Sequence, residues 1–141
     1  NYLSKISGPL LDRLDLHIEV APVEFEHLSS TAKEESSETI RKRVQNAREI
    51  QLERFKGTSI PCNARITSSK LHDFCPLDDK ARTFLGNVFD RMGLSARAYD
   101  RILKVARTIA DLDNKEVIDK SHISQAVQYR SLDRKYWNQR E

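Results

Sequence analysis

The chain has 141 residues, of which 38% are hydrophobic and 32% are charged, and its formal net charge is +3. This length suits one domain with its own core, and the count of only four glycines and four prolines favours a mainly α fold over a turn-rich sheet. The mild positive charge permits a nucleic-acid or nucleotide partner without requiring one, and the lack of a long apolar run excludes a membrane-spanning helix. With two cysteines and no signal peptide, we expect a cytoplasmic protein with no membrane partner.

The first 22 residues read as the end of a larger structure. Pro9 favours the start of a single helical turn over residues 10–13. Residues 14–20 then alternate apolar and polar side chains, which predicts a β-strand that ends before Pro22. One strand cannot pair all of its own backbone groups, so its partner sheet is expected outside the chain. We therefore expect residues 1–30 to be poorly ordered or to pack on a neighbouring molecule.

The polar stretch 23–36 indicates a linker, and helical patterns follow it. Caps and breakers delimit these helices. The predicted helices run from Ser36 or Ser37 to about Phe55, from Pro76 to Met92, from Ser95 to Leu112 and from Ser121 to Tyr129, with a short helical turn from Ser68 or Ser69 to Phe74. We expect a four-helix bundle preceded by the short helix–strand segment.

The predicted helix at 37–55 is apolar on one side and charged elsewhere. Its apolar positions are Ile40, Val44, Ala47 and Phe55, with Ile50 or Leu52 beside them. We expect this face to pack on the domain and the basic face to remain in solvent.

The predicted helix at 95–112 is the centre of the domain. Its apolar stripe consists of Ala98, Ile102, Val105, Ile109 and Leu112 at helical spacing. Ser95 is a suitable N-cap, because its hydroxyl can accept a hydrogen bond from an unpaired amide of the first turn.

Arg97 lies in the first turn of this helix, where the helix dipole is positive and a cation typically costs about 0.3–1 kcal/mol. Helices favour acidic residues there, and local rules tend to be broken where a site requires the residue. An arginine beside first-turn amides suits an anion, either a phosphate or a carboxylate from a neighbouring helix. The residues alone leave both alternatives open.

Arg13 lies where the short helix gives way to the predicted strand. An arginine at such a point can reach the nucleotide of another subunit, as arginine fingers do. The alternative is a surface arginine paired with Asp12 or Asp15.

Other catalytic or metal-binding patterns are weak. Cys62, His72 and Cys75 offer an incomplete set, because structural zinc needs four ligands in paired spacings. Buried structural cysteine is the favoured interpretation, and we assign no metal site. The chain has no G-x-x-x-x-G-K-[ST] loop and no nucleophile–base set, so it cannot hold triphosphate and magnesium by itself.

Four stretches resemble one known family. SGPLLDRLDLHIEV at 7–20 resembles the end of the ATPase core in the magnesium chelatase-like group of AAA+ proteins. ESSETIRKRVQNAREIQ at 35–51 resembles the linker and first lid helix, while LSARAYDRILKVARTIADL and HISQAVQYRSLDR are similar to the C-terminal domain of ComM/YifB-type members. The resemblance covers essentially the whole chain. It implies a core remnant at 1–22, a linker at 23–36 and a helical lid domain at 37–141.

The resemblance implies a ring-forming ATPase, expected as a hexamer, with ATP and magnesium as cofactors of the full-length protein. It implies that Arg13 is the arginine finger acting on a neighbouring subunit's nucleotide, and that Arg97 is the sensor-2 residue that contacts the γ-phosphate. ComM-type members are linked to DNA processing in natural transformation. The implied function couples ATP hydrolysis to DNA remodelling by branch migration, with DNA as partner, whereas the fragment alone is expected to bind no cofactor and to be inactive.

Two alternatives stay open. One is a motor subunit like that of magnesium chelatase, which acts on a metal-insertion partner. The other is a stand-alone helical module that binds nucleic acid through the basic helix at 38–56, which predicts salt-dependent DNA affinity of the isolated chain.

Overall fold

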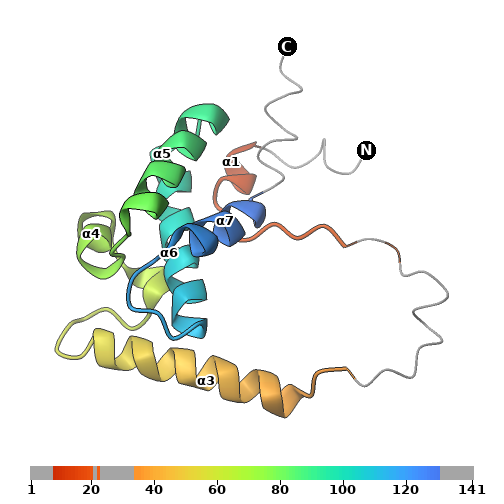
Figure 1. The fold of residues 1–141 in the computed structure, drawn as a ribbon, viewed down its shortest axis with the longest axis vertical. Helices are drawn as coiled ribbons and strands as arrows, with labels where there is room; N and C mark the ends of the chain where they lie inside the picture. The colour runs from red at the N-terminus through yellow and green to blue at the C-terminus, as the bar shows by residue number, and fades with distance from the viewer. Residues whose placement is uncertain (1–7, 21, 23–33, 131–141) are drawn as a thin grey trace.

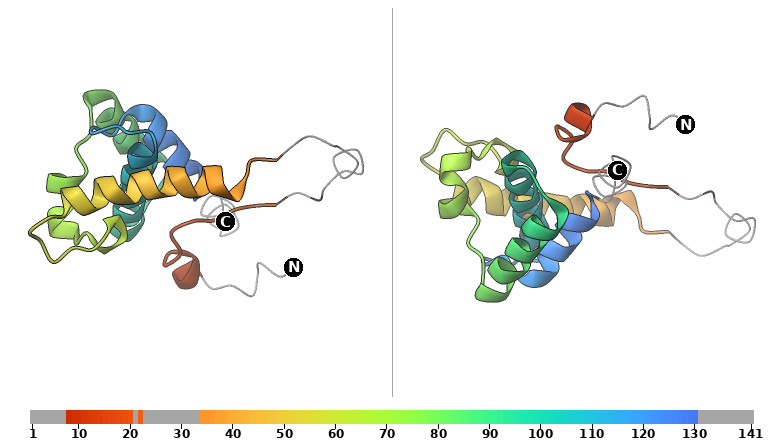
Figure 2. Two further views of the ribbon diagram at one scale, coloured as in Figure 1. Left: turned by 90° about the horizontal axis from the view of Figure 1, so that it is seen from below. Right: turned by 90° about the horizontal axis from the view of Figure 1, so that it is seen from above.

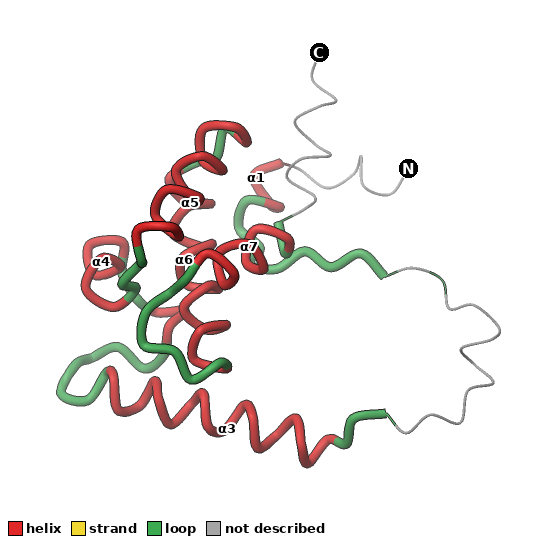
Figure 3. The backbone as a smooth tube through the Cα atoms, in the orientation of Figure 1, coloured by secondary structure: helices red, strands yellow, loops and turns green. Residues whose placement is uncertain are grey.

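The computed structural model describes residues 8–20, 22 and 34–130, and these contain helices and loops but no strand (Figure 3). Its α-helices, labelled in Figure 1, are α1 (Gly8–Leu11), α3 (Ser37–Arg54), α4 (Leu71–Phe74), α5 (Asp79–Met92), α6 (Ala96–Leu112) and α7 (Lys120–Gln128). Two 3₁₀ turns, η2 (Asn63–Arg65) and η3 (Ser68–Lys70), lie between α3 and α4. The predicted mainly α fold is confirmed.

Helix α6 is the centre of the bundle (Figure 1). Helices α3, α4 and α7 and the turn η2 contact it, and α5 packs on α7. Buried apolar side chains from the surrounding segments meet those of α6 in one core, which includes Phe55, Ile66, Leu71, Leu85, Ile102, Leu103, Ile118 and Ile123. The bundle therefore holds both ends of α6 in fixed surroundings.

The predicted start and apolar stripe of α6 are largely confirmed. Ser95 is the N-cap, and its Oγ accepts a hydrogen bond from the amide of Ala98 at 3.1 Å. Ile102 is 1% exposed. The last position of the stripe is wrong, because Leu112 is 37% exposed while the adjacent Asp111 is buried. Consecutive helical residues are about 100° apart, so the ion pairs of Asp111 turn Leu112 toward solvent.

Helix α3 is confirmed close to its predicted length, but its buried face is only partly as predicted. Ala47 is buried, whereas Ile40 is 42% and Val44 is 48% exposed. The N-terminal half of α3 extends past the other helices, so it has nothing to pack against (Figures 1 and 2). The polar Gln51 is buried instead, because its Oε1 accepts a hydrogen bond from the amide of Asn63 at 3.1 Å.

The caps of α5 and α7 show how local chemistry fixes helix ends. Asp78 caps α5, and Gly93 ends it in the left-handed conformation at φ 57°. Helix α7 is capped by Asp119 rather than by the predicted Ser121. The Asp119 carboxylate accepts from the amides of Ser121 at 2.7 Å and His122 at 3.2 Å, which a single hydroxyl does less well.

The short elements between the main helices follow the sequence pattern. The predicted helical turn at 68–74 is present as η3 followed by α4. The extended piece at 117–118 forms one isolated parallel bridge between Leu77 and Ile118. This bridge ties the start of α5 to the start of α7.

The predicted strand at 14–20 is wrong, although the short helix before it is present as α1. The segment is extended but forms no ladder, because no second strand is available among the described residues. Leu16, Ile18 and Val20 are 48%, 66% and 83% exposed, so one predicted apolar face stays in solvent.

Part of this segment packs on the helical domain of the same chain. Leu11 and His17 are buried, and the amide of His17 donates to the carbonyl oxygen of Tyr129 at 2.6 Å. The expectation of poor order or packing on a neighbour is therefore wrong for residues 11–17. Most of the predicted linker lies outside the described residues, and its boundaries stay predictions.

Within the described ranges, no helix combines the length and the hydropathy needed to cross a membrane.

Candidate functional site

The turn that carries Arg13 lies against the start of α6. Its backbone is closed by two hydrogen bonds, from the amide of Arg13 to the carbonyl oxygen of Leu10 and from the amide of Leu14 to that of Leu11, both at 3.0 Å. The Asp12 side chain contacts Arg97 of α6. Because consecutive Cα atoms are about 3.8 Å apart, Arg13 lies next to the residue that Arg97 binds. The fold thus brings the two predicted site arginines to one end of the bundle.

Asp12 is the anion at the start of α6. Its Oδ2 accepts from Arg97 Nη1 at 3.1 Å, and its Oδ1 accepts from the Ser95 hydroxyl at 3.1 Å. A carboxylate at this point balances both the helix dipole and the guanidinium. Of the two alternatives for Arg97, this structure contains the carboxylate. The Arg97 side chain is 62% exposed, so the ion pair contributes at most about 1 kcal/mol.

The carboxylates on both sides of Arg13 pair with α6 and not with Arg13. Asp12 binds Arg97, and Asp15 binds Arg101. Arg13 is exposed, and its guanidinium forms no ion pair or hydrogen bond with any other described residue. The alternative in which Arg13 is neutralised by Asp12 or Asp15 is therefore wrong, and its charge faces solvent.

Arg130 also contacts the Arg13 turn, and the sequence did not reveal this contact. Its side chain is 1% exposed, and its Nη1 donates to the carbonyl oxygen of Leu14 at 2.8 Å. Its Nη2 lies 3.9 Å from Asp12 Oδ1. No local pattern signals this role, because Arg130 and Leu14 are 116 positions apart.

A second polar cluster is buried between α3, η2 and α6. Arg54 donates to the Asp111 carboxylate, Asn63 Nδ2 donates to the same carboxylate at 2.8 Å, and Arg107 Nε does so at 3.1 Å. Arg107 also donates to the carbonyl oxygens of the loop after α6. Burial lowers the pKa of Arg107, and the charge of Asp111 opposes that shift. Because every partner is internal, this cluster holds the bundle together and offers no site for a ligand.

The cysteines have no catalytic or metal-binding surroundings. Cys75 is 3% exposed, and burial raises the pKa of its thiol to about 11. Cys62 is partly exposed, and both thiols are free. Among the described residues, no group of three or more His, Cys, Asp or Glu side chains is arranged to hold a metal ion.

Two known protein families match this chain, one over the helical domain and one over the segment that carries Arg13. Residues 34–130 match the family described as magnesium chelatase, subunit ChlI C-terminal. The chain belongs to this family. Residues 1–28 match a second family, described as magnesium chelatase, subunit ChlI. The resemblance expected from the sequence is confirmed, and Arg13 and Arg97 fall in the two separate matches.

Similar proteins occur in several bacteria. The chain is 42% identical over 134 residues to the protein YifB of Escherichia coli (strain K12), an alignment covering 94% of this chain and 26% of YifB. It is 42% identical over 132 residues to competence protein ComM of Haemophilus influenzae, covering 93% of this chain and 25% of ComM. It is 33% identical over 129 residues to the Mycobacterium bovis protein Mb2921c, covering 92% and 25%. The chain thus spans about a quarter of the length of these family members.

Proposed function

We propose that this chain supplies the lid and the arginine finger of a ring-forming AAA+ ATPase, expected as a hexamer, that remodels DNA. The observation that carries the proposal is the position of the Arg13 turn on the start of α6, beside Arg97. Arg13 is expected to reach ATP bound by a neighbouring subunit. Arg97, at the start of α6, is expected to reach the γ-phosphate of bound ATP.

The contact between Arg97 and Asp12 suits an exchange of ligands. Arg97 is mostly exposed, so leaving Asp12 costs little desolvation. An arriving phosphate carries more charge than a carboxylate and forms strong charge-assisted hydrogen bonds with a guanidinium. Ser95 and the first-turn amides of α6 lie beside the vacated position, where the helix dipole favours an anion. Arg97 would therefore bind Asp12 without nucleotide and phosphate with it.

Magnesium and the rest of the triphosphate are assigned to protein outside this chain. The sequence has no phosphate-binding loop, and the described residues contain no carboxylate set for a metal ion. The chain also covers only about a quarter of each relative. These observations support a division in which another part of the protein binds Mg²⁺–ATP and this chain contributes arginines.

DNA is the proposed substrate of the motor. The name of the relative ComM, a competence protein, supports a role in natural transformation. We extend this to branch migration during recombination. The family description favours one alternative, a motor that acts on a metal-insertion partner as in magnesium chelatase.

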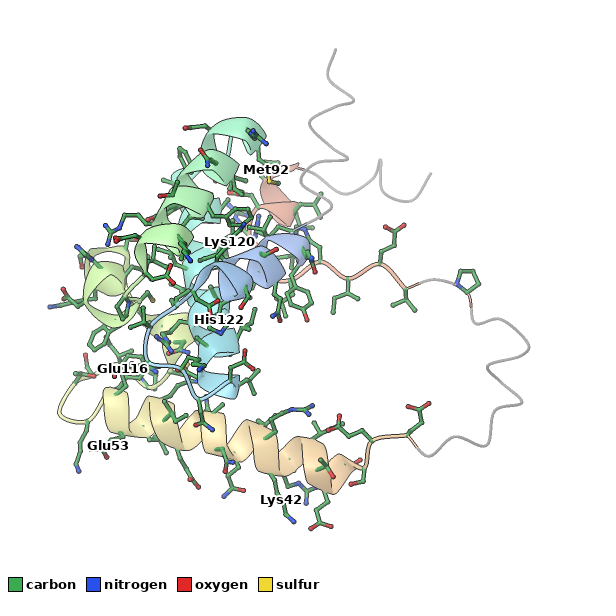
Figure 4. All side chains as sticks on the ribbon, viewed as in Figure 1. Lys42, Glu53, Met92, Glu116, Lys120 and His122 are labelled. Atoms are coloured by element: carbon green, nitrogen blue, oxygen red, sulfur yellow. The ribbon has the colours of Figure 1, made fainter. Side chains whose placement is uncertain are left out.

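The structure gives less support to a stand-alone nucleic-acid module. Lys42 of α3 points away from the bundle (Figure 4), but it pairs with Glu38 at 2.9 Å. Arg43 pairs with Glu35 at 2.7 Å. Local carboxylates therefore offset part of the basic face, which weakens the counterion release that drives DNA binding.

Arginine substitutions in the full-length protein test the ATPase proposal. Arg13→Ala is expected to lower kcat for ATP hydrolysis by about 10³–10⁵-fold, the effect of losing an arginine finger, and Arg97→Ala by at least about tenfold. Thermal unfolding should change little in both, because both side chains are exposed. ATP turnover is measured at saturating ATP.

Arg43→Ala is the matched control, because Arg43 forms an exposed ion pair on α3, away from the Arg13 turn. It should keep wild-type turnover. Wild-type turnover in Arg13→Ala and Arg97→Ala would contradict the ATPase proposal. Stimulation of turnover by branched DNA supports the DNA motor, whereas stimulation only by a metal-insertion partner supports the chelatase-like alternative.

A further inference from the structure

We propose that Arg130 is a positioning residue for Arg13, fixing the turn that carries Arg13 to the helical domain so that the two move together. The inference rests on the proposed function, because it assigns Arg130 a role in presenting the arginine finger. It adds a third arginine to the predicted site residues Arg13 and Arg97.

Arg130 contacts the residues on both sides of Arg13. Its Nη1 donates to the carbonyl oxygen of Leu14 at 2.8 Å, and its Nη2 lies 3.9 Å from Asp12 Oδ1. One planar guanidinium thus hydrogen-bonds the backbone after Arg13 and lies within ion-pair distance of the carboxylate before it. Arg13 itself remains exposed between them.

Further contacts hold the same turn from neighbouring points. The amide of His17 donates to the carbonyl oxygen of Tyr129 at 2.6 Å, one residue before Arg130. The His17 ring, through Nε2, hydrogen-bonds the carbonyl oxygen of Leu11 at 3.1 Å, and Leu11 is buried. The Arg13 turn is therefore attached to the helical domain by a backbone hydrogen bond as well as side-chain contacts, and part of it is buried.

Burial separates Arg130 from the other arginines at this turn. The Arg130 side chain is 1% exposed, whereas those of Arg97 and Arg101 are 62% and 23% exposed. Burying a guanidinium is unfavourable unless its donors find partners, so Arg130 is held where the turn meets it. Arg97 can leave Asp12 for a phosphate while Arg130 keeps the turn in place.

Arg107 is buried like Arg130 but has different contacts. Its side chain is 1% exposed, and it donates to the carbonyl oxygens of Lys115 and Glu116. These contacts close the loop between α6 and α7 and do not reach the Arg13 turn. Both arginines are buried and bind backbone carbonyls, so comparing them separates loss of lid stability from loss of Arg13 positioning.

The test uses the full-length protein and a double-mutant cycle. Arg130→Gln is expected to lower kcat for ATP hydrolysis by about 10²-fold, as for a misplaced catalytic group, and to leave KM for ATP unchanged. In the Arg13→Ala background the same substitution should cause no further loss, because Arg130 acts through Arg13. Arg130→Lys, which keeps a donor and the charge, should recover part of the activity.

Two further variants make the result decisive. Arg107→Gln should lower the unfolding temperature but keep kcat per folded molecule within about twofold of wild type. If Arg130→Gln does not fold, Asp12→Asn replaces it, since Asp12 is partly exposed and should lower kcat non-additively with Arg13→Ala. Equal losses of kcat in the Arg107 and Arg130 variants, or additive losses with Arg13→Ala, would overturn the inference.

Failure of this inference differs from failure of the proposed function. If Arg13→Ala keeps wild-type turnover, the ATPase proposal itself fails. If Arg13→Ala lowers turnover and Arg130→Gln and Asp12→Asn do not, only the positioning role of Arg130 is overturned.

Discussion

Asp12 shows how one carboxylate can serve both a permanent and an exchangeable contact. It accepts from the exposed Arg97 and lies near the buried Arg130. The exposed pair is screened by water and is weak, whereas a buried guanidinium has no solvent to replace its partners. The same side chain can therefore release the exposed Arg97 while its turn stays attached to the domain.

Cys75 allows a test of the buried core at the scale of one residue. Its pKa is raised from 9.0 to about 11, with desolvation by burial as the largest cause. Between pH 9 and 11 the unfolded chain loses this proton more readily than the folded one, so the free energy of unfolding falls as pH rises. Below pH 9 this contribution is fully present.

We expect the fall to reach up to about 3 kcal/mol over that window, as two pKa units imply. Urea unfolding of this chain at pH 8 to 11 measures it. Cys75→Ala is the control, because removal of the thiol should make the decline shallower. A decline of the same steepness in both proteins would contradict the burial of Cys75.

Helix α6 combines apolar packing with ion pairs at the scale of an element. Its buried residues include Ile102 and Leu103 on one side and the charged Arg107 and Asp111 near its end. The charged residues join α6 to α3 through Arg54 and to the following loop. Register of α3 against α6 is thus fixed by polar geometry, because the apolar positions on α3 are few.

Ile102→Ala should lower the free energy of unfolding of this chain by about 2–5 kcal/mol, because a 1% exposed side chain leaves a cavity when truncated. Leu112→Ala, at a position 37% exposed on the same helix, should change it by less than about 1 kcal/mol. Urea denaturation measures both. Similar small effects at both positions would mean that Ile102 does not face the core.

At the scale of the whole molecule, the chain is a helical domain with an additional turn attached to it. The Arg13 turn and the start of α6 come from opposite sides of α3 in the sequence but meet in space (Figures 1 and 2). An ATPase that used this arrangement would link movement of the lid directly to movement of its arginine finger. This follows from the contacts of Arg130 and Tyr129 with the turn.

The isolated chain should show no ATP turnover above background, because no residue in it matches a phosphate-binding loop. Phosphate release is measured with highly purified chain whose helicity is verified by circular dichroism. The full-length protein is the positive control. Turnover that disappears in the Arg97→Ala variant of the isolated chain would show that this chain binds and hydrolyses ATP by itself.

The sequence alone determined the helices, most of their ends and the family. Ser95 and Gly93 act through neighbours within a few residues, so their roles follow from local rules, whereas α5 begins at Asp79 and not at the predicted Pro76. The apolar periodicity of α6 correctly predicted the buried Ala98 and Ile102, whereas Val105 and Ile109 are only partly buried. The family motifs also marked Arg13 and Arg97, whose roles in ATP hydrolysis remain predictions.

Only the tertiary structure decided which charges meet. The pairing of Asp12 with Arg97 and the contact of Arg130 with Leu14 join residues 85 and 116 positions apart. The exposed half of α3 and the exposed apolar side chains at 14–20 depended on which surfaces were available to cover them. Local patterns carry hydrogen-bonding and burial preferences, but they do not encode the distant partner that satisfies them, and this partner determines where Arg13 is held.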